Sequence, residues 1–152
     1  MRRRLTGWRD RRLGCASRGQ SAAEFAMVAP VLLLLLVGVA DFGRVFYTAI
    51  ELNNAARAGT QYGIQSPANG ADIAGMVQAA ENDASDISGL TATASEYCEC
   101  PDGTTQACSS TPCADMRVYV EVDTSATFNT LLDYPGVPAS VSLKGKSVVR
   151  EE

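Results

Sequence analysis

One long uncharged segment constrains this chain more than any other feature. Residues 25–40 read FAMVAPVLLLLLVGVA without a charge, and residues 42–50 continue the apolar character with Arg44 as their one basic residue. A helix rises about 1.5 Å per residue, so this run covers roughly 24 Å, slightly less than the roughly 30 Å hydrocarbon core of a bilayer. The run therefore predicts either a short membrane span, over about residues 25–45, or the apolar part of an export signal.

The charges are distributed unevenly on the two sides of this run. Residues 1–19 hold seven arginines and one acid, which contribute +6 to a chain of net charge −4 and leave −10 for residues 20–152. Basic residues in front of an apolar span stay in the cytoplasm, so the acidic body is predicted to be extracytoplasmic. Nucleic acid is excluded as a partner of this body, because binding to phosphates requires a basic face.

The chain contains no histidine. This excludes Ser-His-Asp and Cys-His nucleophilic chemistry and every histidine-ligated metal site. The acids of the body are spread over helix faces and loops, and their spacing does not fit an EF-hand calcium loop. We therefore predict a protein that is not an enzyme and that has no cofactor and no metal site.

The residues in front of the apolar run form an unusual junction. The basic leader ends at Gly19, small residues follow, and Glu24 stands at the fifth position after that glycine, directly before Phe25. An acid at the edge of a membrane is costly to desolvate and usually has a partner. Glu24 is therefore expected to have a partner of opposite charge.

Residues 18–63 resemble the N-terminal segment of type IV prepilins, and most closely that of the TadE-like minor pilins and pseudopilins of Tad/Flp (tight-adherence) pilus systems. The resemblance is carried by the leader glycine, by Glu24 and by the long apolar helix that follows. Phe25 stands where the major Flp pilins usually have tyrosine, and this chain is longer than those pilins. Both departures favour the minor-pilin branch.

The resemblance implies a function in assembly of a Tad/Flp pilus used for surface adhesion. A prepilin peptidase would cut between Gly19 and Gln20, and Glu24 and Phe25 would act in assembly. The new α-amino group of Gln20 would be protonated, and this ammonium group of one subunit can pair with Glu24 of its neighbour. The implied partners are this peptidase, the major Flp pilin, other minor pilins, the inner-membrane platform with its ATPase, and the lipid bilayer. The protein would cross the bacterial inner membrane once, with a cytoplasmic N-terminus, and could be incorporated in the pilus.

A second interpretation gives residues 1–40 a role in export alone. The triplet Gly38-Val39-Ala40, directly before Asp41, has the small residues of a signal-peptidase site. In this case the body would be a secreted or signal-anchored binding domain without a role in a pilus.

The patterns after the apolar run predict an α+β fold. We expect a long N-terminal helix over residues 20–63, which includes the transmembrane segment, and an extracytoplasmic domain over residues 64–152. After a turn at residues 65–70, apolar residues at helical spacing predict a helix of about 14 residues from Ile73 to near Ser88. Alternating apolar residues then predict about three antiparallel strands, near residues 90–95, 116–123 and 139–144.

The second half of the long helix has a stripe of apolar and mostly small residues. The stripe consists of Val45, Ala49, Leu52, Ala56 and Gly59. Small residues permit close packing, so the stripe is predicted to contact either the sheet of its own domain or the helix of another pilin.

Four of the five cysteines lie within residues 98–113, between two predicted strands: Cys98, Cys100, Cys108 and Cys113. Four cysteines in an oxidising compartment predict two disulfides. The sequence does not select one of the three pairings, although we expect Cys98 and Cys100 not to pair with each other. The alternative is a zinc site with four thiolate ligands, but the usual C-x2-C spacing is missing. The fifth cysteine, Cys15, lies in the leader, so cleavage after Gly19 would leave an even number.

Overall fold

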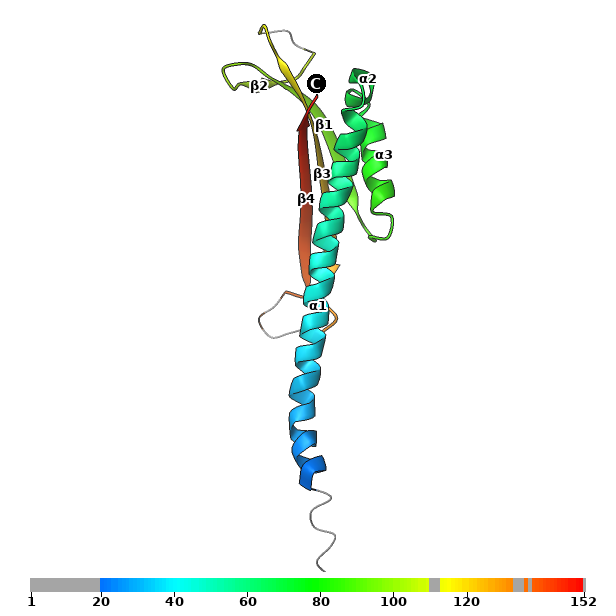
Figure 1. Cartoon of the computed structure of the whole chain (residues 1–152), viewed down its shortest axis with the longest axis vertical. Coiled ribbons are helices and arrows are strands. Elements are labelled where there is room, and N and C mark those ends of the chain that lie inside the picture. Colours follow the sequence, from blue (N-terminus) through cyan, green and yellow to red (C-terminus); the bar gives the residue numbers. More distant parts are fainter. Residues whose placement is uncertain (1–19, 110–112, 133–135, 137, 152) are drawn as a thin grey trace, which may run out of the picture. The chain divides into compact units, whose positions relative to one another are not determined.

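The computed structural model describes residues 20–109, 113–132, 136 and 138–151. Its elements are α1 (Gln20–Gly63), α2 (Pro67–Gly70), α3 (Ile73–Asp83), β1 (Thr91–Glu99), β2 (Thr105–Gln106), β3 (Arg117–Asn129) and β4 (Ser140–Arg150), as Figure 1 shows. This arrangement confirms the predicted α+β class with a long apolar N-terminal helix. The basic leader and the predicted cleavage residue Gly19 lie outside the described residues.

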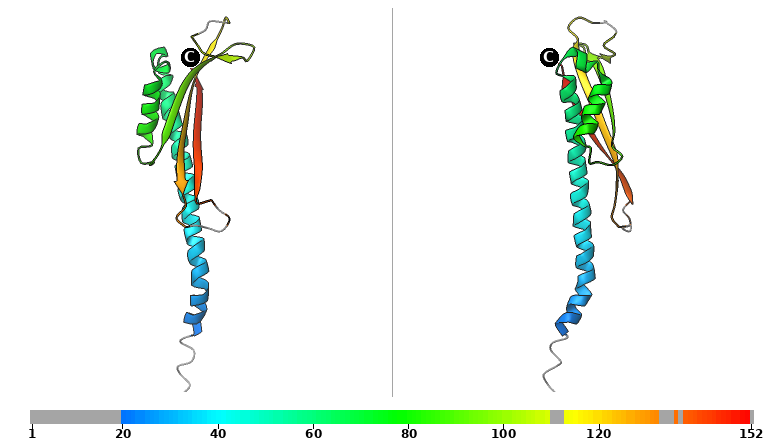
Figure 2. Two further views of the ribbon diagram at one scale, coloured as in Figure 1. Left: turned by 180° about the vertical axis from the view of Figure 1, so that it is seen from behind. Right: turned by 90° about the vertical axis from the view of Figure 1, so that its right-hand side faces the viewer.

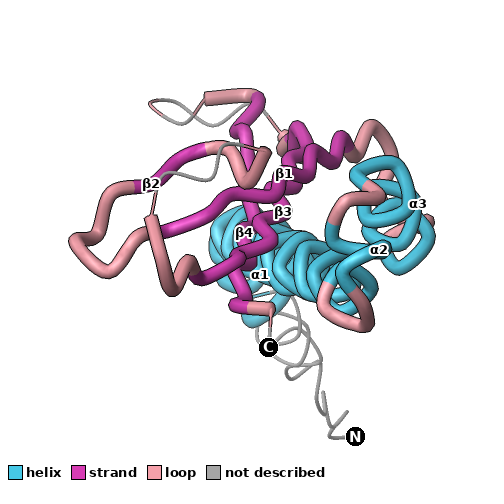
Figure 3. Tube along the Cα trace, turned by 90° about the horizontal axis from the view of Figure 1, so that it is seen from above, coloured by secondary structure: helices cyan, strands magenta, loops and turns pink. Residues whose placement is uncertain are grey.

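The chain divides into two compact units, residues 1–40 and residues 41–152, so helix α1 contributes to both. In the second unit, the strands form one antiparallel sheet in the order β2-β1-β3-β4. Helix α3 and the part of α1 after Asp41 lie on the same face of this sheet (Figure 2, Figure 3). The core of the domain lies between these two helices and the sheet.

Alternation along β3 builds the sheet side of this core. The buried residues are Val120, Val122, Thr124, Ala126 and Phe128, and the residues between them are more exposed. Thr124 interrupts the apolar alternation that predicts a strand up to Asp123, yet the strand continues to Asn129. The reason is that the Thr124 hydroxyl donates a hydrogen bond to the Leu52 carbonyl oxygen, 2.7 Å away, so this polar side chain is satisfied inside the core.

Small residues allow α1 to approach the sheet closely. Leu52, Ala56 and Gly59 of the predicted stripe are buried, so the stripe packs against the sheet of its own domain. A Cβ atom at Gly59 would lie 3.1 Å from the methyl groups of Val122 and 2.9 Å from the Met76 carbonyl oxygen. Any larger residue at position 59 would therefore push α1 away from β3 and α3.

Five elements differ from their sequence-based predictions. Helix α3 ends at Asp83 instead of near Ser88, and its last buried residue is Ala80. Asp83, the last residue of the helix, is followed by Ser85 and Asp86, and the side chains of all three compete with the hydrogen bonds of a helix. The strands β1, β3 and β4 are longer than their alternating segments, and the short strand β2 adds a fourth strand to the expected three.

Two disulfides hold the long connection between β1 and β3. Cys98 is bonded to Cys108, and Cys100 is bonded to Cys113. Both Cys98 and Cys100 are buried, and β2 pairs with the end of β1 inside this connection. The sulfurs are bonded in pairs and are therefore not available as thiolate ligands, and no cluster with the composition of a metal site occurs in the described part of the chain.

Removing one disulfide is expected to destabilise the domain measurably. The variant Cys100→Ser/Cys113→Ser frees a connection that is closed over 13 residues, and the unfolded chain gains entropy worth about 2–3 kcal/mol. The free energy of unfolding, measured by guanidinium titration of the detergent-solubilised chain, should fall by this amount. Cys15→Ser, which removes a cysteine outside the cluster, is the control. Equal stability of the two variants would contradict a structural role for this disulfide.

Candidate functional site: the apolar segment of helix α1

The first half of α1 exposes apolar side chains on all sides. Within the described residues, α1 is the one helix that is long and apolar enough to cross a membrane. Its exposed large residues before Ala40 are Phe25, Met27, Val28, Val31, Leu32, Leu33, Leu34, Leu35, Leu36 and Val39. An apolar surface around the whole helix is typical of a segment that lies in lipid or packs against other helices.

Glu24 is the single ionisable side chain among residues 20–40. It is exposed one helical turn after Gln20, and the Gln20 amide Nε2 lies 3.5 Å from its oxygen Oε1. Phe25, the next residue, is 66% exposed. The structure thus places the side chains of Gln20 and Glu24 next to each other at the beginning of α1.

Asp41 marks the other end of the uncharged run and is buried. Its oxygen Oδ1 lies 3.0 Å from Arg44 Nη1, and its Oδ2 accepts a hydrogen bond from the backbone N–H of Leu131 at 3.0 Å. The Arg44 guanidinium also lies over the ring of Phe128, 4.9 Å from its centroid. The spacing of Asp41 and Arg44 shows in the sequence, but the bond to Leu131 joins residues 90 positions apart and has no local signal.

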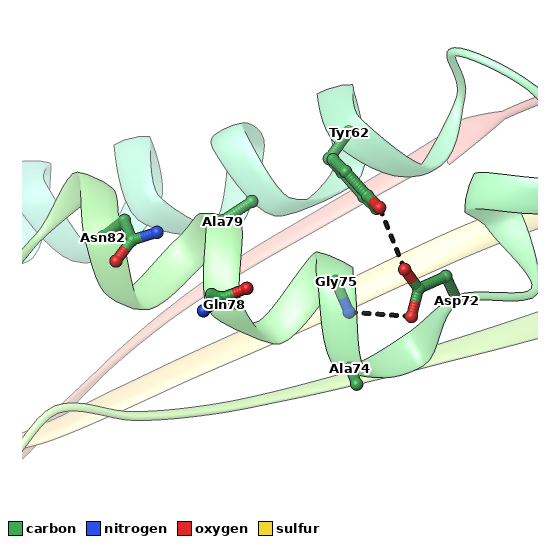
Figure 4. A pocket seen from close by; sticks show the side chains of 7 residues that line it. All are labelled: Tyr62, Asp72, Ala74, Gly75, Gln78, Ala79 and Asn82. Atoms are coloured by element: carbon green, nitrogen blue, oxygen red, sulfur yellow. Dashed lines mark hydrogen bonds between the residues drawn. The ribbon is translucent and has the colours of Figure 1, made fainter.

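A second polar site joins α3 to the end of α1 (Figure 4). A shallow pocket of about 400 Å³ is lined by Tyr62, Asp72, Ala74, Gly75, Gln78, Ala79 and Asn82. Asp72 caps α3: its Oδ1 accepts from the Gly75 N–H at 3.0 Å, and its Oδ2 accepts from the Tyr62 hydroxyl at 2.9 Å. Both hydrogen bonds favour the charged carboxylate and hold the pKa of Asp72 below its ordinary value. An aspartate directly before a helical apolar pattern is a recognisable cap signal, whereas the contact with Tyr62 is tertiary.

The Asp72 cap is expected to make stability depend on pH. Asp72→Ala should lower the melting temperature by a few degrees at pH 7, because the Gly75 N–H and the Tyr62 hydroxyl lose their acceptor. A lowered pKa in the folded state stabilises the domain above the unfolded pKa of about 3.9, and this stabilisation disappears as the pH falls through the folded value. The difference in melting temperature between wild type and Asp72→Ala should therefore shrink below about pH 4. Asp83→Ala removes a carboxylate from the other end of α3 and is the control. An equal loss of melting temperature in the two variants would contradict the role of the Asp72 cap.

Comparison with known proteins gives one match, over the segment described above. No curated protein and no solved structure matches the chain. A family model described as TadE-like protein matches residues 19–61, from the predicted cleavage position to the end of the buried stripe. The resemblance to the TadE-like family, a family associated with the Tad pilus, is thereby confirmed for this segment of the chain.

Proposed function

We propose that this protein is a minor pilin of a Tad/Flp pilus, anchored in the bacterial inner membrane by α1 and acting in pilus assembly without catalysis. The observation that carries the proposal is the exposed apolar segment of α1 with Glu24 as its one ionisable side chain. It lies inside the residues that match the TadE-like family.

In this proposal, a prepilin peptidase removes the leader by cutting between Gly19 and Gln20, and α1 remains attached to the mature protein. The bilayer holds α1 until the inner-membrane platform and its ATPase transfer the subunit toward the major pilin and other minor pilins. During this transfer, Glu24 pairs with the α-amino group of a neighbouring subunit, which offsets the desolvation of both charges. The domain of residues 41–152 remains on the extracytoplasmic side, where disulfides are stable.

A second candidate function is that of a secreted binding domain. One observation favours it: the boundary between the two compact units falls between Ala40 and Asp41, the position of the alternative signal-peptidase site. In this case residues 1–40 would serve export alone, and Glu24 would be absent from the mature protein.

The intact mass of the protein extracted from its native host distinguishes the two candidates. A processed pilin should start at Gln20, and its mass should be reduced by two hydrogen atoms for each of the two disulfides. Mass measurement suits this question because an N-terminal glutamine can cyclise and block chemical sequencing. A start at Asp41 would reject the pilin proposal, because the helix segment that carries Glu24 would be missing.

A further inference from the structure

The loop after β3 is tied to the point where the uncharged run of α1 ends. Asp41 directly follows that run, and its carboxylate accepts hydrogen bonds from the backbone N–H of Leu131 at 3.0 and 3.3 Å. Arg44 Nη1 lies 3.0 Å from this carboxylate and supplies a counter-charge. Asp41 is only 6% exposed, so the carboxylate is shielded from water. Leu131 therefore lies at the same level along α1 as Asp41.

The length of the uncharged run places Asp41 at the edge of a bilayer. From Phe25 to Asp41 a helix rises roughly 24 Å, which is less than the roughly 30 Å of hydrocarbon. When Glu24 lies at the cytoplasmic interface, Asp41 lies just inside the extracytoplasmic boundary of the hydrocarbon. A charge at this depth requires partners, and Arg44 and the Leu131 N–H supply them.

Several apolar side chains close in the chain to Asp41 or Leu131 are exposed. Leu131 is 56% exposed and Leu132 is 44% exposed, although leucine is usually buried in domains of this kind. On α1, Phe42 and Phe46 are 70% and 61% exposed. Both leucines follow the end of β3 at Asn129.

We propose that Leu131 and Leu132 insert into the extracytoplasmic interface of the bilayer that α1 crosses, and that the Asp41–Leu131 hydrogen bonds hold them at that depth. The inference rests on the membrane-anchored topology of the proposed function. A lipid surface is the occupant that fits, because Leu131 is bonded to Asp41, the residue that directly follows the uncharged run. The pair gives the domain a second contact with the membrane, besides α1 itself.

Tryptophan fluorescence in lipid nanodiscs tests this contact. The full chain, with its single native tryptophan removed by Trp8→Phe, is reconstituted in phosphatidylcholine with or without brominated acyl chains, which quench nearby indole rings. Leu132→Trp is the test variant, and Leu131→Trp repeats the test at the neighbouring position. Leu34→Trp reports insertion of α1. Val148→Trp is the matched control, because Val148 is 41% exposed and Leu132 is 44% exposed. Val148 lies roughly 26 Å along β4 from Ser140, the first residue of that strand.

The expected result is quenching by about twofold or more at positions 34 and 132, with no quenching at position 148. Quenching at Leu34→Trp without quenching at Leu132→Trp and Leu131→Trp would overturn the inference and leave the membrane anchor intact. Equal quenching at positions 132 and 148 would also overturn it, because the contact would not be specific to this loop. Absence of quenching at Leu34→Trp would reject the anchor itself, and with it the proposed function.

Discussion

Replacing Glu24 with alanine is expected to abolish incorporation of the protein into pili and to leave its insertion into the membrane unchanged. Insertion depends on the apolar residues after Glu24, and the loss of one exposed charge does not weaken it. In the proposed assembly step, however, the α-amino group of the neighbouring subunit would become desolvated without a counter-charge. We expect the amount of this protein in sheared pili to fall about a hundredfold or more, measured by immunoblot against the amount in the membrane fraction.

Two further variants test whether the charge of Glu24 is the feature that assembly requires. Glu24→Gln keeps the length and polarity of the side chain but removes the charge, and it should fail like Glu24→Ala. Glu81→Gln removes one charge from an exposed position of α3 and should assemble normally. If Glu24→Gln assembled normally, the role of Glu24 would not depend on pairing of its carboxylate with an ammonium group. Loss of the protein from the membrane in all Glu24 variants would instead indicate a function in export.

Replacing Gly145 with valine is expected to destabilise the domain more than any other single substitution considered above. Gly145 is buried in β4, and a Cβ atom there would lie 2.5 Å from the backbone C and O atoms of Leu52 and 2.8 Å from the backbone nitrogen of Asn53. These neighbours belong to the backbone of α1 and cannot move away by a change of rotamer. Helix α1 and β4 must separate, so the free energy of unfolding should fall by at least about 3 kcal/mol.

A neighbouring position on β4 provides the control for this experiment. Lys144→Val introduces the same residue one position earlier, on the exposed side of the strand. Its free energy of unfolding should stay within about 0.5 kcal/mol of wild type. Gly145→Ala should lie between wild type and Gly145→Val, because alanine brings the clashing Cβ atom without the two methyl groups. A stable Gly145→Val variant would mean that α1 does not pack this closely on β4.

Contacts between α1 and the sheet cannot be predicted from local sequence patterns. The apolar alternation of β3 and the helical spacing after Ile73 are local patterns, and they predicted the correct kinds of element. The extension of β3 past Thr124, by contrast, depends on a tertiary contact. Thr124 reads as a break in the pattern because its hydroxyl is polar, and only the carbonyl oxygen of Leu52, 72 positions earlier, makes it a core residue.

Local sequence patterns are enough to predict an α+β fold with a long apolar N-terminal helix. A run of sixteen uncharged residues, with Glu24 in front and a basic leader before it, requires a membrane or a helix bundle on physical grounds. The tertiary structure alone decided three further points: the pairing of Cys98 with Cys108 and of Cys100 with Cys113, the packing of α1 on its own sheet, and the bond between Asp41 and Leu131. The physical reason is distance along the chain. Hydrophobic periodicity depends on residues that are close in the sequence, whereas these contacts join residues that come together only when the sheet and helices have formed.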